Sequence, residues 1–182
     1  MSCGPLRENL VLIGFMGCGK STVGRLLHQM LGWPLVDMDG LIEQRAEMSI
    51  PAIFAAEGEA GFRKREGELL AELEKDGQCQ RIIATGGGVV LDPENRARLR
   101  RLGYVVWLRA PARTVLERTS RNHDRPLLQT ENPLERIQTM LAERMPLYQE
   151  TAHLEIETAD LSADEIATGI LESARYDFGP RE

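Results

Sequence analysis

The feature that most constrains this chain is the segment Gly14-Phe-Met-Gly-Cys-Gly-Lys-Ser21, which matches the pattern G-x-x-x-x-G-K-[S/T]. It follows a short apolar run, Leu10–Ile13, and precedes a segment of helical periodicity, Lys20–Leu31. In this strand–loop–helix context, glycines let backbone N–H groups turn toward a polyphosphate, and the helix presents its positive end to the same charge. We therefore expect nucleotide binding here rather than an ordinary glycine-rich turn.

Single residues of this phosphate loop have predictable roles. Lys20 can reach the β- and γ-phosphates of ATP, and the hydroxyl of Ser21 can bind Mg²⁺. Cys18 is interpreted as a small spacer, although a thiol at a helix N-terminus can also become reactive. The predicted ATP-binding residues of the loop are Gly17, Cys18, Gly19, Lys20, Ser21 and Thr22.

Short apolar runs alternate with longer segments of helical periodicity, which is typical of strand–helix units in a parallel sheet covered on both faces. The predicted fold class is therefore α/β, and a length of 182 residues fits a single domain with a core over about 9–175. The predicted strands are Leu10–Ile13, Leu35–Asp37, Arg81–Ala84, Val105–Leu108 and Leu154–Glu157. The predicted helices are Lys20–Leu31, Glu59–Asp76, Pro93–Arg101, Pro111–Arg121, Pro133–Met145 and Ser162–Arg175.

Composition narrows the class of ligand and the compartment. A formal net charge of −6 disfavours nucleic acid and anionic membrane surfaces as partners. Cys3, Cys18 and Cys79 form neither a CxxC pair nor a zinc-ligand set, and the apolar runs are too short to cross a membrane. We expect a cytoplasmic protein that binds small ligands.

Two carboxylates, Asp37 and Asp39, lie at the end of the second predicted strand. Alternation along a strand would send both side chains to one side, at the carboxyl edge of the sheet where α/β proteins bind ligands. One carboxylate could hold the water shell of Mg²⁺, while the other takes the hydroxyl proton of an acceptor. The alternative is that both acids cap the following helix.

A second glycine cluster, Gly86–Gly88, follows the third predicted strand and would reach the same edge. It would let a small ligand approach the main chain, although a tight turn with positive φ is an alternative reason for the glycines. The polar stretch Asn122–Asn132 has no periodicity and is interpreted as a lid loop.

Three arginines, Arg63, Arg125 and Arg144, lie where a solvated helix face is not the obvious explanation. Guanidinium groups bind carboxylates and phosphates in a bidentate manner, so a site that collects several implies an anionic acceptor. The alternative for each is a surface ion pair. The residues alone thus predict a kinase for a small, acidic, hydroxylated metabolite.

Taken in order, these segments resemble the shikimate kinase family from about Asn9 to about Thr158. Family members often carry glycine where this chain has Glu47, and alanine or serine where it has Cys18. The matching blocks are Leu12–Arg25, Asp37–Asp39, Ile42–Glu43, Ser49–Ile50, Ile53–Phe54, Gly58–Glu59, Phe62–Arg63, Glu66, Ala84–Val90, Val106–Leu108, Arg125–Leu128 and Arg144–Glu150.

The resemblance implies a three-layer, nucleoside-monophosphate-kinase-like fold with a five-stranded parallel sheet flanked by helices. It also implies a helical substrate-binding region at about 39–73 and a lid at about 118–132. In the implied site, Asp39 binds the ring hydroxyls of shikimate and acts as the general base, while Asp37 and Ser21 hold Mg²⁺.

Further roles come from the same resemblance. Arg63 and Arg144 would bind the shikimate carboxylate, with Glu66 orienting Arg63. Arg125 would reach from the lid to the transferred phosphoryl group beside Lys20. The remaining implied contacts are Arg118 with adenine, Gly86, Gly87 and Gly88 with the acceptor, and Phe54 and Phe62 with its ring.

The expected reaction is transfer of the γ-phosphoryl group of ATP to the 3-hydroxyl of shikimate, a step toward chorismate and the aromatic amino acids. The expected ligands are shikimate, ATP and Mg²⁺, and the expected state is a monomer. Two alternatives stay open: a gluconate or other small-metabolite kinase on the same fold, and an ATP-binding module without catalysis. Intact polar residues argue against the second, namely Lys20, Ser21, Asp37 and Asp39.

Overall fold

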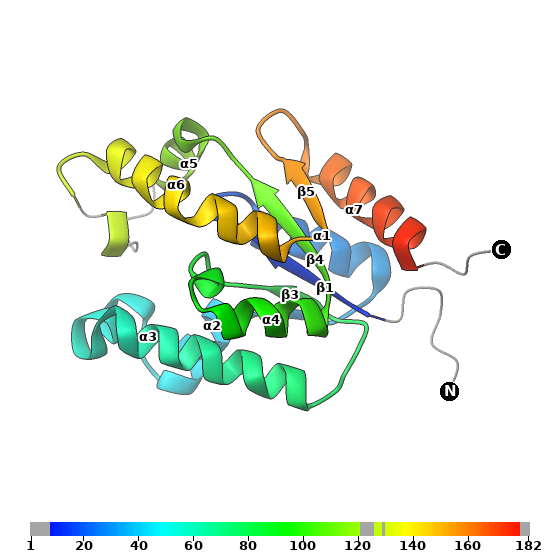
Figure 1. Cartoon of the computed structure of the whole chain (residues 1–182), viewed down its shortest axis with the longest axis horizontal. Helices are drawn as coiled ribbons and strands as arrows, with labels where there is room; N and C mark the ends of the chain where they lie inside the picture. Colours follow the sequence, from blue (N-terminus) through cyan, green and yellow to red (C-terminus); the bar gives the residue numbers. More distant parts are fainter. Residues whose placement is uncertain (1–7, 121–125, 129, 179–182) are drawn as a thin grey trace.

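The computed structural model describes residues 8–120, 126–128 and 130–178. In this part of the chain a five-stranded parallel sheet lies between layers of helices, with strand order β2-β3-β1-β4-β5 (Figure 1). The predicted α/β class and parallel sheet are confirmed. The strands are β1 (Asn9–Ile13), β2 (Leu35–Asp37), β3 (Ile82–Ala84), β4 (Gly103–Arg109) and β5 (Leu154–Glu157).

The helices alternate with the strands along the chain. They are α1 (Lys20–Leu31), α2 (Met38–Ala46), α3 (Ile50–Lys75), α4 (Pro93–Leu102), α5 (Ala112–Thr119), α6 (Pro133–Thr151) and α7 (Ala163–Phe178). Two short 3₁₀ helices, η1 (Val89–Leu91) and η2 (Pro126–Leu128), complete the described elements. None of the helices within the described ranges combines the length and the apolarity that a membrane span requires.

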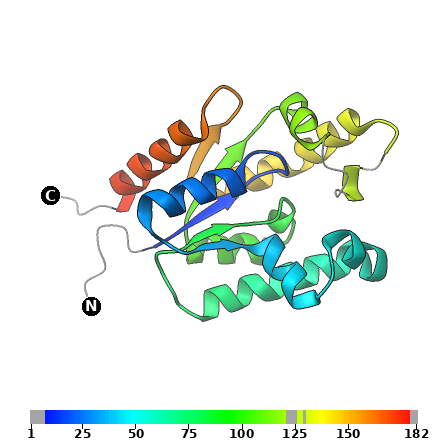
Figure 2. The ribbon, with the colours of Figure 1, turned by 180° about the vertical axis from the view of Figure 1, so that it is seen from behind.

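Alternation along β1 divides the hydrophobic core into two halves. Leu10 and Leu12 belong to the half that includes α1 and α7, which Figure 2 shows on one face of the sheet. Val11 and Ile13 belong to the half that includes α3 and α4 on the other face. Because both faces are covered, the strand must be apolar throughout, and this explains the continuous apolar run in the sequence.

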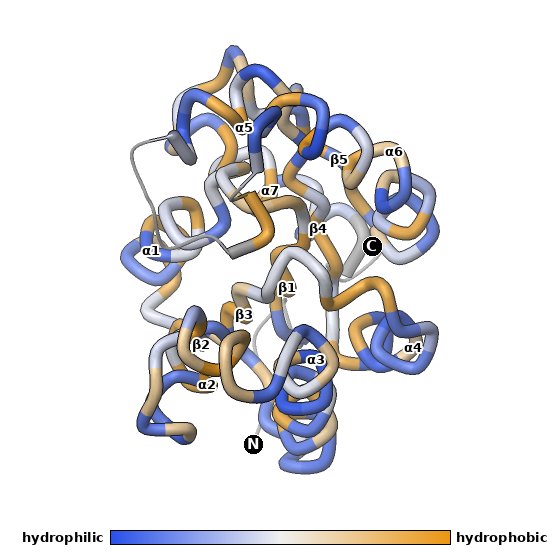
Figure 3. The backbone as a smooth tube through the Cα atoms, turned by 90° about the vertical axis from the view of Figure 1, so that its left-hand side faces the viewer, coloured by the Kyte–Doolittle hydropathy of each residue, from blue (hydrophilic) through white to orange (hydrophobic). Residues whose placement is uncertain are grey.

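Figure 3 shows the molecule from the side to which the carboxyl ends of the strands point. Hydrophobic residues gather in the centre, at β1 and β4. Hydrophilic segments lie on the outer turns of the helices, such as those of α3. Loops that follow parallel strands all emerge at this carboxyl edge, so it is where a ligand site is expected.

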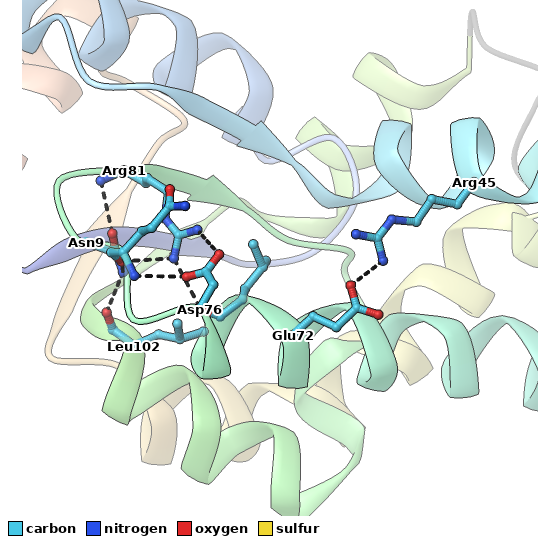
Figure 4. A network of polar contacts seen from close by, with 8 residues as sticks. Asn9, Arg45, Glu72, Asp76, Arg81 and Leu102 are labelled. Carbon is cyan, nitrogen blue, oxygen red and sulfur yellow. Dashed lines mark hydrogen bonds and ion pairs between the residues drawn. The ribbon is translucent and has the colours of Figure 1, made fainter.

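At the opposite edge of the sheet, where β1 begins, lies a polar network around Asn9 and Arg81 (Figure 4). The side-chain amide of Asn9 donates to the carbonyl of Leu102 (2.9 Å) and accepts from the backbone N–H of Arg81 (3.0 Å). The Arg81 guanidinium in turn pairs with Asp76 (2.7 Å) and donates to the carbonyl of Leu73 (3.1 Å). These bonds tie β1 and β3 to the ends of α3 and α4.

The helices predicted from periodicity leave out 38–46, although the resemblance implies a helical region at about 39–73, and the structure has α2 there. Its apolar signal is weak, because only Met38 and Ile42 are buried. The helix depends instead on its ends, capped by Asp37 and terminated at Glu47, whose φ of 53° is left-handed. A non-glycine residue in that conformation costs about 1–2 kcal/mol.

Helix α3 begins earlier than the predicted Glu59, at Ile50, and contains a kink at Gly58. Gly58 has φ 71° and ψ −178°, a conformation that is essentially restricted to glycine. An ion pair between Arg65 and Glu57 (2.6 Å) spans the kink. The ion pair links the two arms, and each arm contributes one aromatic ring to the site described below.

Helix α6 extends beyond its predicted end at Met145 to Thr151, although it contains Pro146. Proline removes one backbone hydrogen bond and usually ends a helix, which is why the sequence predicts a stop. Here Tyr148 and Thr151 are both fully buried against the rest of the fold. Their packing outweighs the missing bond.

Candidate active site

Two cavities meet at the carboxyl edge of the sheet. The larger has a volume of about 490 Å³ and is bounded by the phosphate loop, the start of α2, Arg118 and the loop after β5. The smaller has a volume of about 70 Å³ and lies between α3, the Gly86–Gly88 turn and α6. Met16, Asp39 and Gly87 line both cavities. The arrangement therefore offers two adjoining compartments with a shared wall.

The phosphate loop forms the base of the larger cavity, as predicted. The ammonium group of Lys20 donates to the carbonyls of Gly14 (2.7 Å) and Phe15 (3.0 Å), so it lies inside the curve of the loop. Helix α1 is capped by Gly19, which supplies no side-chain hydrogen bond to the first turn. The N–H groups of that turn are thus available to an anion.

The other predicted loop residues also line this cavity: Gly17, Cys18, Ser21 and Thr22. The thiol of Cys18 is buried and lies 3.7 Å from the ammonium nitrogen of Lys20. Because Cys18 is buried within the loop, its surroundings favour the spacer interpretation.

Asp37 and Asp39 both line the larger cavity, but the predicted reason for their placement is wrong. The strand stops at Asp37 and the helix starts at Met38, so the two carboxylates are not alternate residues of a strand. Asp37 caps α2 by accepting from the N–H of Gly40 (3.5 Å), and Asp39 lies in the first turn of that helix. The capping alternative therefore applies to Asp37, which faces the cavity at the same time.

Arg63 enters the smaller cavity from the second arm of α3. Its guanidinium pairs with Glu66 at 2.6 Å and with Glu59 at 3.4 Å. Glu66 has no exposed surface, and burial raises the pKa of its carboxyl while the neighbouring Arg63 acts in the opposite direction. The ion pair fixes the direction of the Arg63 side chain, as the resemblance implies for Glu66.

Phe54 and Phe62 come from the two arms of α3 and line the smaller cavity together. Their ring centroids are 5.2 Å apart, and the Arg63 guanidinium lies 5.1 Å from the centroid of Phe62. These contacts form an apolar wall beside a positive charge. Such a wall suits a ligand with a carbon ring and an acidic group.

The Gly86–Gly88 turn is glycine-rich because its surroundings leave no room for side chains. A methyl group on Gly86 would overlap a carboxyl oxygen of Glu66, and one on Gly88 would overlap the guanidinium of Arg63. None of the three glycines has a positive φ, so the alternative of a turn that requires left-handed residues is wrong. The turn brings bare backbone to the cavity.

Arg144 reaches the smaller cavity from α6, opposite Arg63. It is only 4% exposed, donates from Nη1 to the carbonyl of Gly87 (3.2 Å) and lies 5.5 Å from the ring centroid of Phe15. Two arginines from different helices thus converge on one small cavity. Burial next to an apolar ring strengthens the attraction of such a charge for an anionic group.

Arg118 lines the larger cavity and joins two of its walls. Its guanidinium donates to the carbonyl of Gly17 (3.3 Å) and to the carbonyl of Thr158 (3.2 Å). No nucleotide contact is predicted from the sequence after Thr158. The structure nevertheless lines this cavity with residues of that region as well, namely Thr158, Leu161, Ala163 and Ile166. The sequence did contain a signal for this placement: β5 is predicted as a strand of the parallel sheet, and the loop after such a strand emerges at the carboxyl edge.

Arg125 lies outside the described residues, as does part of the predicted lid at about 118–132. Within the described ranges, no group of three or more His, Cys, Asp or Glu side chains could hold a metal ion. Ser21 and Asp37 line the same cavity and supply oxygen atoms. This fits Mg²⁺ that arrives with a nucleotide, because the ion takes one or two protein ligands and completes its shell with phosphates and water.

Comparisons with known proteins agree with this geometry. The family model for shikimate kinase matches residues 16–175. A shikimate kinase of Thioalkalivibrio sulfidiphilus (strain HL-EbGR7) is 48% identical over 169 residues, which cover 93% of this chain and 86% of the relative. The solved structure of a shikimate kinase from Acinetobacter baumannii in complex with shikimate is 43% identical, has a TM-score of 0.90 and is matched over 94% of each chain.

A more distant solved structure separates fold from family. A gluconokinase from Sinorhizobium meliloti 1021 has a TM-score of 0.56 and 16% identity, matched over 95% of this chain and 94% of its own, which is a likeness of fold alone. The family model and the close relatives, by contrast, extend over nearly the whole chain. The chain belongs to the shikimate kinase family.

Proposed function

We propose that the protein transfers the γ-phosphoryl group of ATP to the 3-hydroxyl of shikimate, giving shikimate 3-phosphate and ADP on the route to chorismate. The observation that carries the proposal is the shared wall: Asp39 lines both the cavity of the phosphate loop and the cavity with two arginines. A group at that position can face an acceptor hydroxyl on one side and a terminal phosphate on the other.

Each half of the site has a role in this proposal. Arg63 and Arg144 bind the carboxylate of shikimate, and Phe54 and Phe62 pack against its ring. Asp39 accepts the proton of the attacking hydroxyl as the general base. Phosphoryl transfer through a loose transition state needs mainly positioning and charge stabilisation, and this set of residues can supply both.

The nucleotide half is assigned in the same way. Lys20 binds the β- and γ-phosphates, Arg118 lies against adenine, and Arg125 approaches the transferred group from the lid. Ser21 and Asp37 hold Mg²⁺, which neutralises phosphate charge when bound. A monomeric state and a cytoplasmic location remain predictions, which gel filtration and cell fractionation would test.

A substrate panel tests the reaction directly. ADP release is measured in a coupled assay with Mg·ATP and shikimate, gluconate or a nucleoside monophosphate as acceptor. We expect turnover with shikimate and none with the other two. Turnover with gluconate or a nucleotide alone would reject the acceptor assignment, and ATP binding without turnover on any acceptor would indicate a non-catalytic module.

Removal of the metal provides a second test. We expect excess EDTA to abolish shikimate-dependent ADP release and added Mg²⁺ to restore it, because the phosphate charges need a divalent cation. The coupling enzymes are checked in parallel with added ADP, so that their own metal requirement is not mistaken for that of the kinase. Activity that persists in EDTA would contradict the metal assignment.

Replacing Arg144 by alanine should raise KM for shikimate by about 10- to 100-fold, the loss expected for a charge-assisted contact of roughly 1.5–3 kcal/mol. KM for ATP should change far less. Arg100→Ala is the matched control, because Arg100 lies on α4 and donates to the carbonyls of Glu150 (3.2 Å) and Thr151 (3.1 Å) without lining either cavity. An unchanged KM for shikimate in Arg144→Ala would contradict the carboxylate-binding role.

A further inference from the structure

The carbonyl oxygen of Gly87 is held by two side chains of α6. It accepts a hydrogen bond from Nη1 of Arg144 (3.2 Å) and another from the hydroxyl of Tyr148. The carbonyls of Gly86 and Gly88 accept instead from the backbone N–H groups of Val89 (3.4 Å) and Leu91 (3.0 Å). The Gly87 carbonyl therefore connects α6 to the glycine turn through two hydrogen bonds.

Tyr148 is buried behind the site and lines neither cavity. Its ring stacks on Trp107 of β4, with centroids 5.6 Å apart and an interplanar angle of 24°. The Tyr148 hydroxyl is the donor in its bond to Gly87, and burial moves its pKa further above neutral pH, where a tyrosine hydroxyl is already protonated. The donor is therefore held by the packing of the Tyr148 ring of α6 against Trp107 of β4.

Arg144 and Tyr148 lie one helical turn apart and share a face of α6. Pro146 lies between them and lacks an N–H, so the carbonyl four residues before it, on Ala142, loses its helical partner. The backbone that carries Arg144 is held less tightly by the helix itself at this point. A side-chain anchor one turn later therefore has more influence on where Arg144 lies.

The same anchor acts on the glycine turn. In a trans peptide group the C=O and the following N–H point in opposite directions. When Tyr148 draws the carbonyl of Gly87 toward α6, the N–H of Gly88 is directed away from α6. Gly88 lines the smaller cavity next to Arg63, and Gly87 packs against the backbone of Met16 in the phosphate loop. One hydroxyl thus influences both walls of the smaller cavity.

We propose that Tyr148 is a positioning residue for the acceptor: through the Gly87 carbonyl, its hydroxyl holds the Gly86–Gly88 turn and Arg144 in the arrangement that binds a small acid. The inference rests on the proposed function, in which that acid is shikimate. Tyr148 itself touches neither substrate.

Tyr148→Phe tests the inference, since it removes the hydroxyl and keeps the ring on Trp107. We expect KM for shikimate to rise about 3- to 10-fold, the range for one lost hydrogen bond, with KM for Mg·ATP within about twofold of wild type. Tyr104→Phe is the matched control: Tyr104 is also buried, and its hydroxyl is 2.9 Å from Oγ of Ser173, away from both cavities. Thermal unfolding of both variants measures any general loss of stability.

The outcomes separate a positioning role from a structural one. A rise in KM for shikimate in Tyr148→Phe but not in Tyr104→Phe supports the proposal. Equal values in the two variants, or an equal rise of both Michaelis constants in Tyr148→Phe, overturns it. If Tyr148→Phe does not fold, Trp107→Phe is used instead. It weakens the packing against the Tyr148 ring and keeps the Tyr148 hydroxyl, and the same selective rise in KM for shikimate is expected.

The substrate panel with wild-type enzyme shows whether a negative result counts against the role of Tyr148 or against the proposed function. If it turns over another acid of the substrate panel, the comparison is repeated with that acid, and the positioning role stands or falls on its KM. If it turns over no acceptor at all, the proposed function and the inference fail together.

Discussion

Asp39→Asn is expected to lower kcat by about 10²- to 10⁴-fold, the usual contribution of a general base, while ATP still binds. Asparagine has the size of aspartate but cannot accept the proton of the shikimate hydroxyl. Asp39 lines both cavities, so it is the carboxylate that can face acceptor and nucleotide together. Steady-state kinetics and a separate titration with ATP measure the two effects.

Asp92→Asn is the matched control for this charge change. Asp92 caps α4 by accepting from the N–H of Glu94 (2.8 Å), and asparagine is an equally good cap, so kcat should not change. A near-normal kcat in Asp39→Asn would remove the general-base assignment. A loss of ATP binding together with kcat would indicate instead that the carboxylate acts mainly on the nucleotide.

Gly14→Ala should be the most destabilising single change in the phosphate loop, with a loss of more than about 4 kcal/mol in the free energy of unfolding. Gly14 has a φ of 139°, and a methyl group there would overlap the carbonyl oxygen of Leu108 in β4. Backbone in a central strand cannot move aside as a flexible side chain can. Urea unfolding of the variant would measure the loss.

Gly32→Ala separates backbone conformation from steric overlap. Gly32 is also left-handed, with a φ of 70°, but a methyl group on it would meet no atom within 4 Å. Its replacement should therefore cost only about 1 kcal/mol. Similar losses in the two variants would show that the overlap with Leu108 is relieved by local movement.

Much of this site could be predicted from the sequence, because its parts are short motifs with strong local signals. The phosphate loop between an apolar strand and a helix indicated the position of Lys20 and Ser21, and the ordered blocks indicated the family, which is confirmed. Arg63 and Arg144 were predicted as a pair, and they do converge on one small cavity.

Other features depend on tertiary contacts that local patterns do not report. Helix α2 has few buried apolar residues, so it depends on the Asp37 cap rather than on a periodic pattern of apolar residues. The role of Tyr148 follows from a bond to Gly87, 61 positions earlier in the chain. The length of α6 follows from the packing of residues after Pro146, where a local rule predicts a stop.

The common wall of Met16, Asp39 and Gly87 has a pharmacological consequence. A bisubstrate inhibitor, with a cyclic acid tethered to adenosine through a phosphate chain, could occupy both compartments at once. Tethering turns the second docking event into an intramolecular one, so avidity rises sharply when the tether matches the span. Kinases that share only this fold, and have no pair of guanidinium groups beside the phosphate loop, would lack the matching half.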